Sequence, residues 1–365
     1  MHLIIDAHED LAWNILTFQR DYSRSALQTR ISESNTPIPQ HNGDTMLGWP
    51  EYQAGKVAVI FATLFASPER RNKGPWDTQS YANVEQAYRL FSKQLEAYIC
   101  LTDKYPEKFQ LIKTSKELNT LIKSWRESSL PSGNNKTPPV GLVILMEGAE
   151  AIRHLDDLEF YWEAGVRLIG PAWASNRFCG GTREPGPLTT AGISLLEAMA
   201  DLGFILDISH MDETALKQAL DIYPGKIIAS HANASALIKG YEGNRHLNDN
   251  AIHHLIERDG IIGIIPFNTF LDYEWRLYRD RNFITLEKVI SQIDHVCQIA
   301  GDANHVGIGT DFDGGFGLQD TPIELETIAD LQKIAVLLEK NGYTEKNIAS
   351  IMGQNWQHML EYNLP

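Results

Sequence analysis

One complete strand–helix–strand unit occupies residues 204–231, FILDISHMDETALKQALDIYPGKIIASH. Two apolar runs of buried-strand length, residues 204–209 and 226–230, flank a segment of helical period at residues 212–222. Strands that a helix joins in this way lie parallel in one sheet. Each of the two strands is followed directly by a histidine, so the unit also carries polar chemistry at the strand ends.

The same alternation continues along the whole chain. Eight apolar runs are separated by helical segments, and eight such units are the number that closes an α/β barrel of the (β/α)8 TIM type. An open doubly wound sheet is the alternative. We expect strands at residues 3–6, 57–66, 140–146, 166–172, 204–209, 226–230, 261–267 and 305–310. We expect helices at residues 81–105, 191–202, 212–222, 249–258, 285–300 and 322–341.

Two long segments show neither the period of a helix nor the pattern of a strand. Residues 17–56 follow the first strand, and residues 129–139 are rich in proline, glycine and asparagine. The loop after a barrel strand lies over the mouth, so we expect residues 17–56 to form a lid or a wall of the substrate pocket. Residues 129–139 predict an exposed loop. The length suits one large barrel, and we expect a single domain over residues 1–365.

Composition excludes several classes of protein. With 43% hydrophobic and 22% charged residues, the chain is neither disordered, collagenous nor disulfide-stapled. Its 47 acidic and 32 basic residues give a net charge of -15, which disfavours nucleic acid and membrane surfaces as partners. The N-terminal residues lack the pattern of a secretory signal. Three scattered cysteines, Cys100, Cys179 and Cys297, predict reduced thiols in a cytoplasmic protein.

Polar chemistry collects where the expected strands end. Five of the eight strands run into His, Asp or Glu, and a barrel brings the carboxyl ends of its strands to one mouth. A buried carboxylate without a partner there would cost several kcal/mol. The side chains are His8 and Asp10 after the first strand, Glu147 after the third, His210 after the fifth, His231 after the sixth and Asp311 after the eighth.

This set predicts a metal centre. A lone histidine at a strand end is more often structural, but three imidazoles and two carboxylates together suit zinc or another borderline divalent ion. Five ligands exceed the three of a mononuclear catalytic zinc site. If Glu147 bridges two ions, the ligands divide into His8, Asp10 and Glu147 on one side and Glu147, His210 and His231 on the other. Such a pair could hold a water or hydroxide, and Asp311, left unliganded, could pass its proton to a leaving amine.

Five blocks of the chain resemble the membrane (renal) dipeptidase family of the amidohydrolase superfamily. They occur in the family's order and read DAHEDLAW (6–13), MEG (146–148), GFILDISH (203–210), SHANA (230–234) and GTDFDG (309–314). The resemblance implies an amidohydrolase-like barrel with two zinc ions that hydrolyses dipeptides, often as a homodimer. It also implies that Arg245, in NRHLND (244–249), holds the terminal carboxylate of the substrate, a task that suits a guanidinium fork.

One position departs from the family. The family usually carries a histidine just after the fourth strand, in contact with the scissile carbonyl, where this chain has Trp173 in GVRLIGPAWASN (165–176). An indole N–H donates one hydrogen bond but carries no charge, so a contact worth about 2.7–4 kcal/mol is weakened or replaced. Two functions follow: a zinc-dependent hydrolase of dipeptides or dipeptide-like amides, or a metal-binding barrel with another role, such as a different amide substrate, isomerisation or non-catalytic binding.

Other polar residues are less informative. His154 and the pair His253-His254 are expected on solvated helix surfaces, and residues 179–186, CGGTREPG, form a flexible loop beside Trp173 that shapes the pocket or has no role. The chain contains no GxGxxG after its first strand, no GxxxxGK[ST] and no GxSxG, which argues against dinucleotide, phosphate-loop and serine-hydrolase functions.

Overall fold

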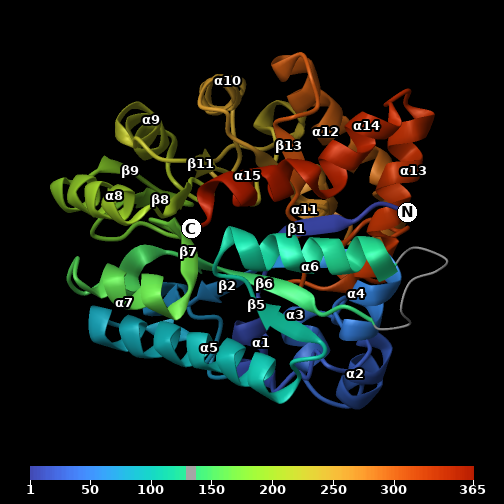
Figure 1. Ribbon diagram of the computed structural model, residues 1–365, viewed down its shortest axis with the longest axis horizontal. Coiled ribbons are helices and arrows are strands. Elements are labelled where there is room, and N and C mark those ends of the chain that lie inside the picture. The colour runs from blue at the N-terminus through green and yellow to red at the C-terminus, as the bar shows by residue number, and fades with distance from the viewer. Residues whose placement is uncertain (129–136) are drawn as a thin grey trace.

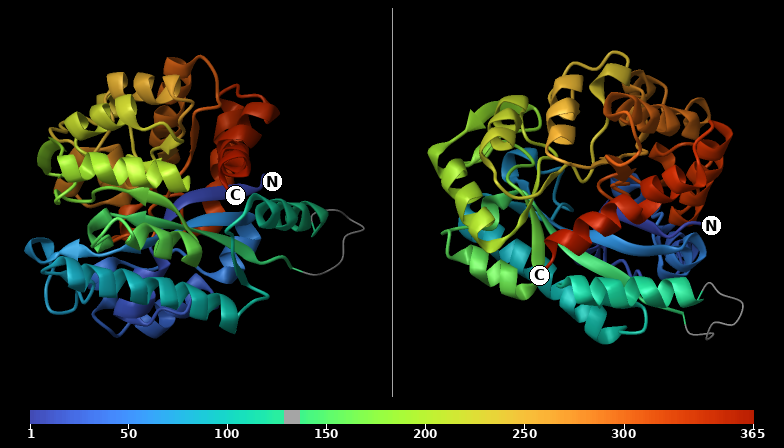
Figure 2. Two further views of the ribbon diagram at one scale, coloured as in Figure 1. Left: turned by 60° about the vertical axis from the view of Figure 1, so that its left-hand side comes forward. Right: turned by 45° about the horizontal axis from the view of Figure 1, so that its top comes forward.

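The structure, a computed structural model, describes residues 1–128 and 137–365. At its centre, eight parallel strands stand side by side and helices surround them (Figure 1; Figure 2, right). Neighbouring strands pair in the order β11–β10–β7–β6–β2–β1–β13–β12. The eight strands are β1 (Ile4–Glu9), β2 (Val57–Phe65), β6 (Val140–Glu147), β7 (Val166–Gly170), β10 (Ile205–Asp207), β11 (Ile227–Ile228), β12 (Ile262–Ile264) and β13 (Val306–Ile308).

The two outermost strands of this order meet and complete the barrel. Ala229, just after β11, forms a parallel bridge with Ile262, and the N–H of Gly263 donates to the Ala229 carbonyl at 2.8 Å. A Cβ atom at Gly263 would lie 1.9 Å from the Ser230 carbonyl oxygen, so only glycine permits this close approach. The predicted TIM barrel is confirmed, and the open doubly wound sheet is excluded.

All eight expected strands are present, because each is an apolar run that the barrel buries completely or nearly so. β6, for example, is buried at every residue. β5 (Phe109–Leu111) was not predicted. It pairs with the first residues of β6, along the same edge of that strand with which β7 pairs further on. Three residues are too few to show a period, and pairing with a longer strand stabilises them.

Helices cover the outside of the barrel. Those expected at residues 81–105, 191–202, 212–222, 249–258 and 285–300 are confirmed, while others, such as α6 across the middle of Figure 1, were not predicted. The longer helices are α5 (Val84–Lys104), α6 (Ser115–Ser128), α7 (Asp157–Ala164), α8 (Thr190–Leu202), α9 (Glu213–Ile222), α10 (Asp249–Glu257), α12 (Leu286–Ala300), α13 (Gln332–Lys340) and α15 (Asn355–Asn363).

The helix expected at residues 322–341 starts later than its apolar stripe suggested. Residues 322–327 form turns, a 3-10 turn covers Ile328–Leu331, and α13 follows. The guanidinium of Arg281 donates to the carbonyl oxygens of Pro322 at 3.0 Å and Leu325 at 2.6 Å, which a helix would have used internally. A distant arginine therefore overrides the local helical period.

The segment after β1 is helical and is fastened to the loop after β13. It contains α1 (Leu11–Phe18), α2 (Ala26–Glu33), α3 (Ile38–Asn42) and α4 (Trp49–Gly55). Asp313 is fully buried and accepts hydrogen bonds from Arg20 at 3.0 Å, the Tyr22 hydroxyl at 2.9 Å and the Met46 N–H at 3.0 Å. One carboxylate thus joins chain segments that are almost 300 residues apart.

Several smaller expectations are corrected. Residues 179–186 belong to an ordered hairpin of β8 (Cys179–Gly181) and β9 (Glu184–Leu188) rather than a flexible loop. His154 is exposed as expected, but it lies in the turn before α7 and not in a helix. On α10, His253 is exposed and His254 half-buried. Most of the loop expected at residues 129–139 lies outside the described residues.

Two further findings concern the thiols and the helices. Cys100, Cys179 and Cys297 are all free, as predicted, with Cys100 exposed and the other two buried. Within residues 1–128 and 137–365, no helix is long and apolar enough to cross a membrane.

Removing the Asp313 carboxylate tests how much the folded state depends on it. Asp313→Ala leaves the fully buried Arg20 guanidinium with less charge compensation, and breaking a buried ion pair from one side typically costs about 3–5 kcal/mol. We expect the free energy of unfolding in urea to fall by about that amount. The control Glu127→Ala breaks an exposed helical pair with Lys123. An Asp313→Ala loss no larger than that of the control would contradict the role of Asp313.

Candidate metal centre

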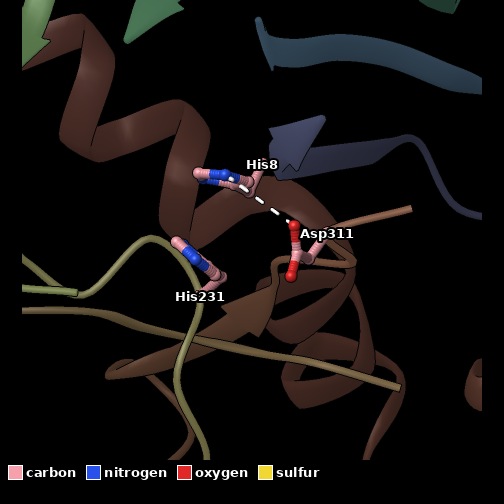
Figure 3. Close-up of side chains that lie close together, drawn as sticks. All are labelled: His8, His231 and Asp311. Carbon is pink, nitrogen blue, oxygen red and sulfur yellow. Dashed lines mark ion pairs between the residues drawn. The ribbon is translucent and has the colours of Figure 1, made fainter. Parts of the chain in front are cut away.

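The strand-end residues predicted from sequence do converge at the barrel mouth. Figure 3 shows His8, His231 and Asp311, which come from the ends of three different strands, with an ion-pair line between His8 and Asp311. The structure contains three overlapping groups whose nitrogen and oxygen donor atoms lie within 4.8 Å of one another. They are His8, Asp10 and Glu147; Glu147, His210 and His231; and His8, His231 and Asp311.

Glu147 stands between the first two groups. Its Oε1 atom lies 2.9 Å from His210 Nε2 and 3.4 Å from His231 Nε2, whereas its Oε2 atom lies 3.6 Å from His8 Nε2. The two oxygens of one carboxylate therefore face different imidazoles. This is the arrangement that a bridging ligand between two cations requires.

The imidazoles differ in their electrostatic surroundings. Burial lowers the pKa of His8, but the Glu147 carboxylate, with Asp311 and Asp10, more than offsets this and raises the pKa to about 9. Burial and the positive charge of Arg245 lower the pKa of His210 to about 4. Neutral imidazoles are metal ligands, whereas the raised pKa of His8 reports how strongly the neighbouring carboxylates attract positive charge.

The carboxylates are crowded together in a nearly dry site. Asp10 and Glu147 are each only 5% exposed. Burial and the charge of Glu147 raise the pKa of Asp10 to about 6, and burial raises the pKa of Asp311. Burial also raises the pKa of Glu147, but His8 and the hydrogen bond from His210 outweigh it and lower that pKa. Positive charge must compensate such a cluster.

The donor atoms fit divalent cations. His8 Nε2 is buried and has no hydrogen-bond partner among the described residues, although it points at Glu147 and Asp311. The Nε2 atoms of His210 and His231 lie 2.9 Å apart. Two neutral imidazoles whose Nε2 atoms converge and face carboxylate oxygens form a nitrogen and oxygen donor set typical of zinc.

A second layer of polar residues orients these candidate ligands. Thr182 Oγ1 lies 2.9 Å from His210 Nδ1, and Ser230 Oγ lies 2.8 Å from His231 Nδ1. Ser230 in turn donates to Asp207 at 2.5 Å. Such contacts fix the ring orientation and the tautomer of a ligand histidine.

Sequence reasoning missed these supporting residues, and only some of them left a signal. The hydroxyl of Thr63 donates to the Asp10 carboxylate, and Thr63 is the single polar residue in the apolar run of β2. A lone hydroxyl in a buried strand could have been noticed. Thr182 reaches His210 from a separate hairpin, and nothing in the sequence indicates that proximity.

Two site residues adopt strained backbone conformations. The φ angles of His210 and Asp311 are 67° and 58°, in the left-handed region that residues with a Cβ rarely occupy. Each costs on the order of 1–3 kcal/mol and persists only where its surroundings enforce it. The Asp311 N–H donates to the His8 carbonyl at 3.0 Å, which holds the turn in place.

Arg245 and Trp173 border the same site. Arg245 is 5% exposed. Its guanidinium donates from Nη2 to the His231 carbonyl at 3.0 Å, while Nε and Nη1 have no partner among the described residues. Unpaired donors of this kind suit an anionic ligand. The Trp173 ring packs at 5.1 Å from that of Phe65 and at 6.1 Å from that of His210.

A cavity of about 560 Å³ opens over the centre. Residues 17–56 were expected to form its wall, but none of them is among the residues that line it. The wall comes from the segment after β2, from Trp173, from the hairpin at Thr182 and Arg183, and from aromatic residues in the loops after β12 and β13. Residues 17–56 instead bind Asp313 through Arg20 and Met46, so they support the loop after β13 and form no part of the cavity surface.

Comparisons with known proteins agree with this geometry. A model of the membrane dipeptidase family, peptidase family M19, matches residues 1–362. Dipeptidase verJ of Clonostachys rogersoniana is 26% identical over 358 residues, which cover 96% of this chain and 82% of that protein. An uncharacterized protein in the pqqA 5' region of Klebsiella pneumoniae is 32% identical over 214 residues, 56% of this chain and 75% of that protein.

A solved structure shares the fold. A metallopeptidase from Rhodobacter sphaeroides, liganded with a phosphinate mimic of the dipeptide L-Ala-D-Ala, has a TM-score of 0.76 at 22% identity, and the match covers 99% of both chains. The family model spans nearly the whole chain, including every strand end that contributes to the centre. The chain therefore belongs to the membrane dipeptidase family, peptidase family M19, and is a metal-dependent dipeptidase.

Proposed function

We propose that this chain hydrolyses dipeptides or dipeptide-like amides at a centre of two zinc ions. The observation that carries the proposal is the division of the donors around Glu147, with one oxygen toward His210 and His231 and the other toward His8. In this proposal His8, Asp10 and Glu147 hold one ion, and Glu147, His210 and His231 hold the other. When bound, zinc supplies positive charge that acidifies a water and polarises the scissile carbonyl.

Asp311 is proposed as the group that moves the proton. Hydrolysis adds a water to the peptide carbon, so one proton must pass from that water to the leaving amine. The Asp311 carboxylate borders the cavity, its side chain is 14% exposed, and Oδ1 lies 3.9 Å from His8 Nε2. It can accept a proton from a water held over the centre and release it on the cavity side.

Arg245 and Trp173 are proposed to position the substrate. The unpartnered Nε and Nη1 donors of Arg245 suit the two oxygens of a terminal carboxylate. Trp173 contributes an apolar face beside His210, and its indole N–H offers a single neutral donor to the substrate. Three further statements stay predictions: the protein is a homodimer, it is cytoplasmic, and it forms a single domain over residues 1–365.

Glu147→Gln tests the bridging role. The amide keeps the shape of the side chain but loses its charge and offers one oxygen instead of two. We expect the zinc content to fall from two ions per chain to one or none. Mutating a residue that only supports a metal ligand commonly lowers metal affinity or activity about 10–100-fold. We therefore expect dipeptide hydrolysis to fall by more than about 100-fold when the bridging residue itself is changed.

Metal analysis by mass spectrometry and an assay of dipeptide cleavage measure both effects of Glu147→Gln. Glu159→Gln, an exposed change on α7, is the matched control and should retain both properties. Two ions per chain in Glu147→Gln would contradict the bridging assignment.

Asp311→Asn tests whether Asp311 carries the proton or binds a metal ion. We expect kcat to fall by about 10²–10⁴-fold, the usual contribution of general acid–base catalysis, while two zinc ions remain bound. Because Asp311 also forms a donor group with His8 and His231, loss of an ion in this variant would instead show that Asp311 is a ligand.

Arg245→Lys tests carboxylate recognition. Lysine keeps the charge but not the planar fork, and hydrogen bonds to charged groups contribute about 1.5–3 kcal/mol. We expect KM for a dipeptide with a free terminal carboxylate to rise by about tenfold or more. Cleavage of the same dipeptide with a terminal amide should change little. Equal losses on both substrates would contradict the assignment.

A further inference from the structure

We propose that the mouth of this cavity selects dipeptides that carry an acidic side chain, and that Lys73 and Arg183 hold the second carboxylate. This inference rests on the proposed function and names the substrate class of the same site. It starts from an imbalance of charge: the chain has a net charge of -15, yet the outer wall of its cavity is rich in cations.

Two of these cations are already paired. Arg70 and Arg71, in the segment after β2, both bind Glu184 of β9, at 2.5 and 2.7 Å. This shared carboxylate joins two loops that border the mouth and holds them at a fixed separation. Because one Glu184 serves two guanidinium groups, the cluster keeps one uncompensated positive charge.

Lys73 lies at the rim without an ion-pair partner. No carboxylate oxygen of the described residues is within 4.0 Å of its Nζ atom. A Cβ atom at Gly315 would lie 3.0 Å from that Nζ, so the ammonium group lies over the turn that follows Asp311. The nearby Asp77 is buried, and it accepts a hydrogen bond from the Lys73 backbone N–H at 3.2 Å, not from its ammonium group.

Arg183 borders the cavity from the tip of the β8–β9 hairpin. Its backbone φ of 63° lies in the left-handed region, and its N–H donates to Asn244 Oδ1 at 2.8 Å. These contacts fix the backbone and leave the guanidinium exposed, with no carboxylate of the described residues within 4.0 Å. Asn244 precedes Arg245, so the hairpin tip is tied to the segment that carries the carboxylate anchor.

The charges of the rim therefore favour an anion. Arg70, Arg71, Lys73 and Arg183 give four positive charges, against two negative charges from Glu184 and Asp77. Six aromatic side chains line the cavity beside these charged groups and offer apolar contacts to the rest of a substrate. They are Trp13, Phe65, Trp173, Phe267, Phe270 and Phe316.

The anion expected at the rim is a second carboxylate of the substrate, distinct from its terminal carboxylate. In the proposed function Arg245, deep beside the metal ligands, takes the terminal carboxylate that every dipeptide has. Lys73 and Arg183 lie at the rim and remain available for a different group of the same substrate. A side-chain carboxylate of Asp or Glu is the group that a dipeptide can offer.

Pairs of substrates that differ only in this charge test the inference. Ala-Glu is compared with Ala-Gln, and Glu-Ala with Gln-Ala, each with L and with D C-terminal residues. We expect kcat/KM to favour the Glu member of at least one pair by about tenfold or more, as hydrogen bonds to a charged group allow. The preference should shrink at high salt, because the rim is open to solvent.

The double variant Lys73→Gln/Arg183→Gln should bring the Glu-to-Gln ratio close to 1, through a higher KM for the Glu substrate. The control Lys116→Gln/Lys123→Gln removes the same charge from exposed positions on α6 and should leave the ratio unchanged. Either a wild-type ratio near 1, or equal losses on both members of a pair in the double variant, would overturn the inference while leaving the proposed function intact. Cleavage of no dipeptide at full zinc occupancy would instead contradict the proposed function.

Discussion

The mutual repulsion of three carboxylates at the end of a closed barrel is the constraint on which the rest of the site depends. Asp10, Glu147 and Asp311 come from three strands and are brought together where little water remains to screen them. Burial raises the pKa of Asp10 and of Asp311, and the carboxylates raise the pKa of His8 despite its burial. A cluster of this kind is stable only with positive charge among its members, which is what divalent ions provide.

The remainder of the fold maintains this unfavourable arrangement. Rigid strand ends supply the ligands, and hydroxyl groups such as those of Thr63, Thr182 and Ser230 hold their orientation. Strained backbone at His210 and Asp311 would relax if the surrounding turns were free to move. Beneath the cavity lining, Asp313 fastens the helical segment after β1 to the loop that carries Asp311. The stability of the surrounding fold offsets the backbone strain at these two residues.

The deep part of the cavity and its rim differ in the groups that they offer to a ligand. Near the candidate metal ligands, Arg245 presents unpaired donors in a buried setting, which suits a carboxylate. The Trp173 ring adds an apolar face beside Phe65 and His210. The rim has the opposite character, because it carries solvent-exposed cations that attract anions over a longer range. The overall acidity of the chain gives no indication of this local excess.

The sequence alone determined the eight strands and the residues at their ends, because both signals are local. An apolar run predicts a buried strand whatever its neighbours are, and parallel strands must bring their carboxyl ends together. The tertiary structure decided what depends on distant contacts. Arg281 prevented a helix over residues 322–327 by binding their carbonyl groups, and β5 formed only because β6 offered it an edge. The cavity wall likewise came partly from the segment after β2 instead of residues 17–56, since which loops face the mouth is set by packing between segments that the sequence does not relate.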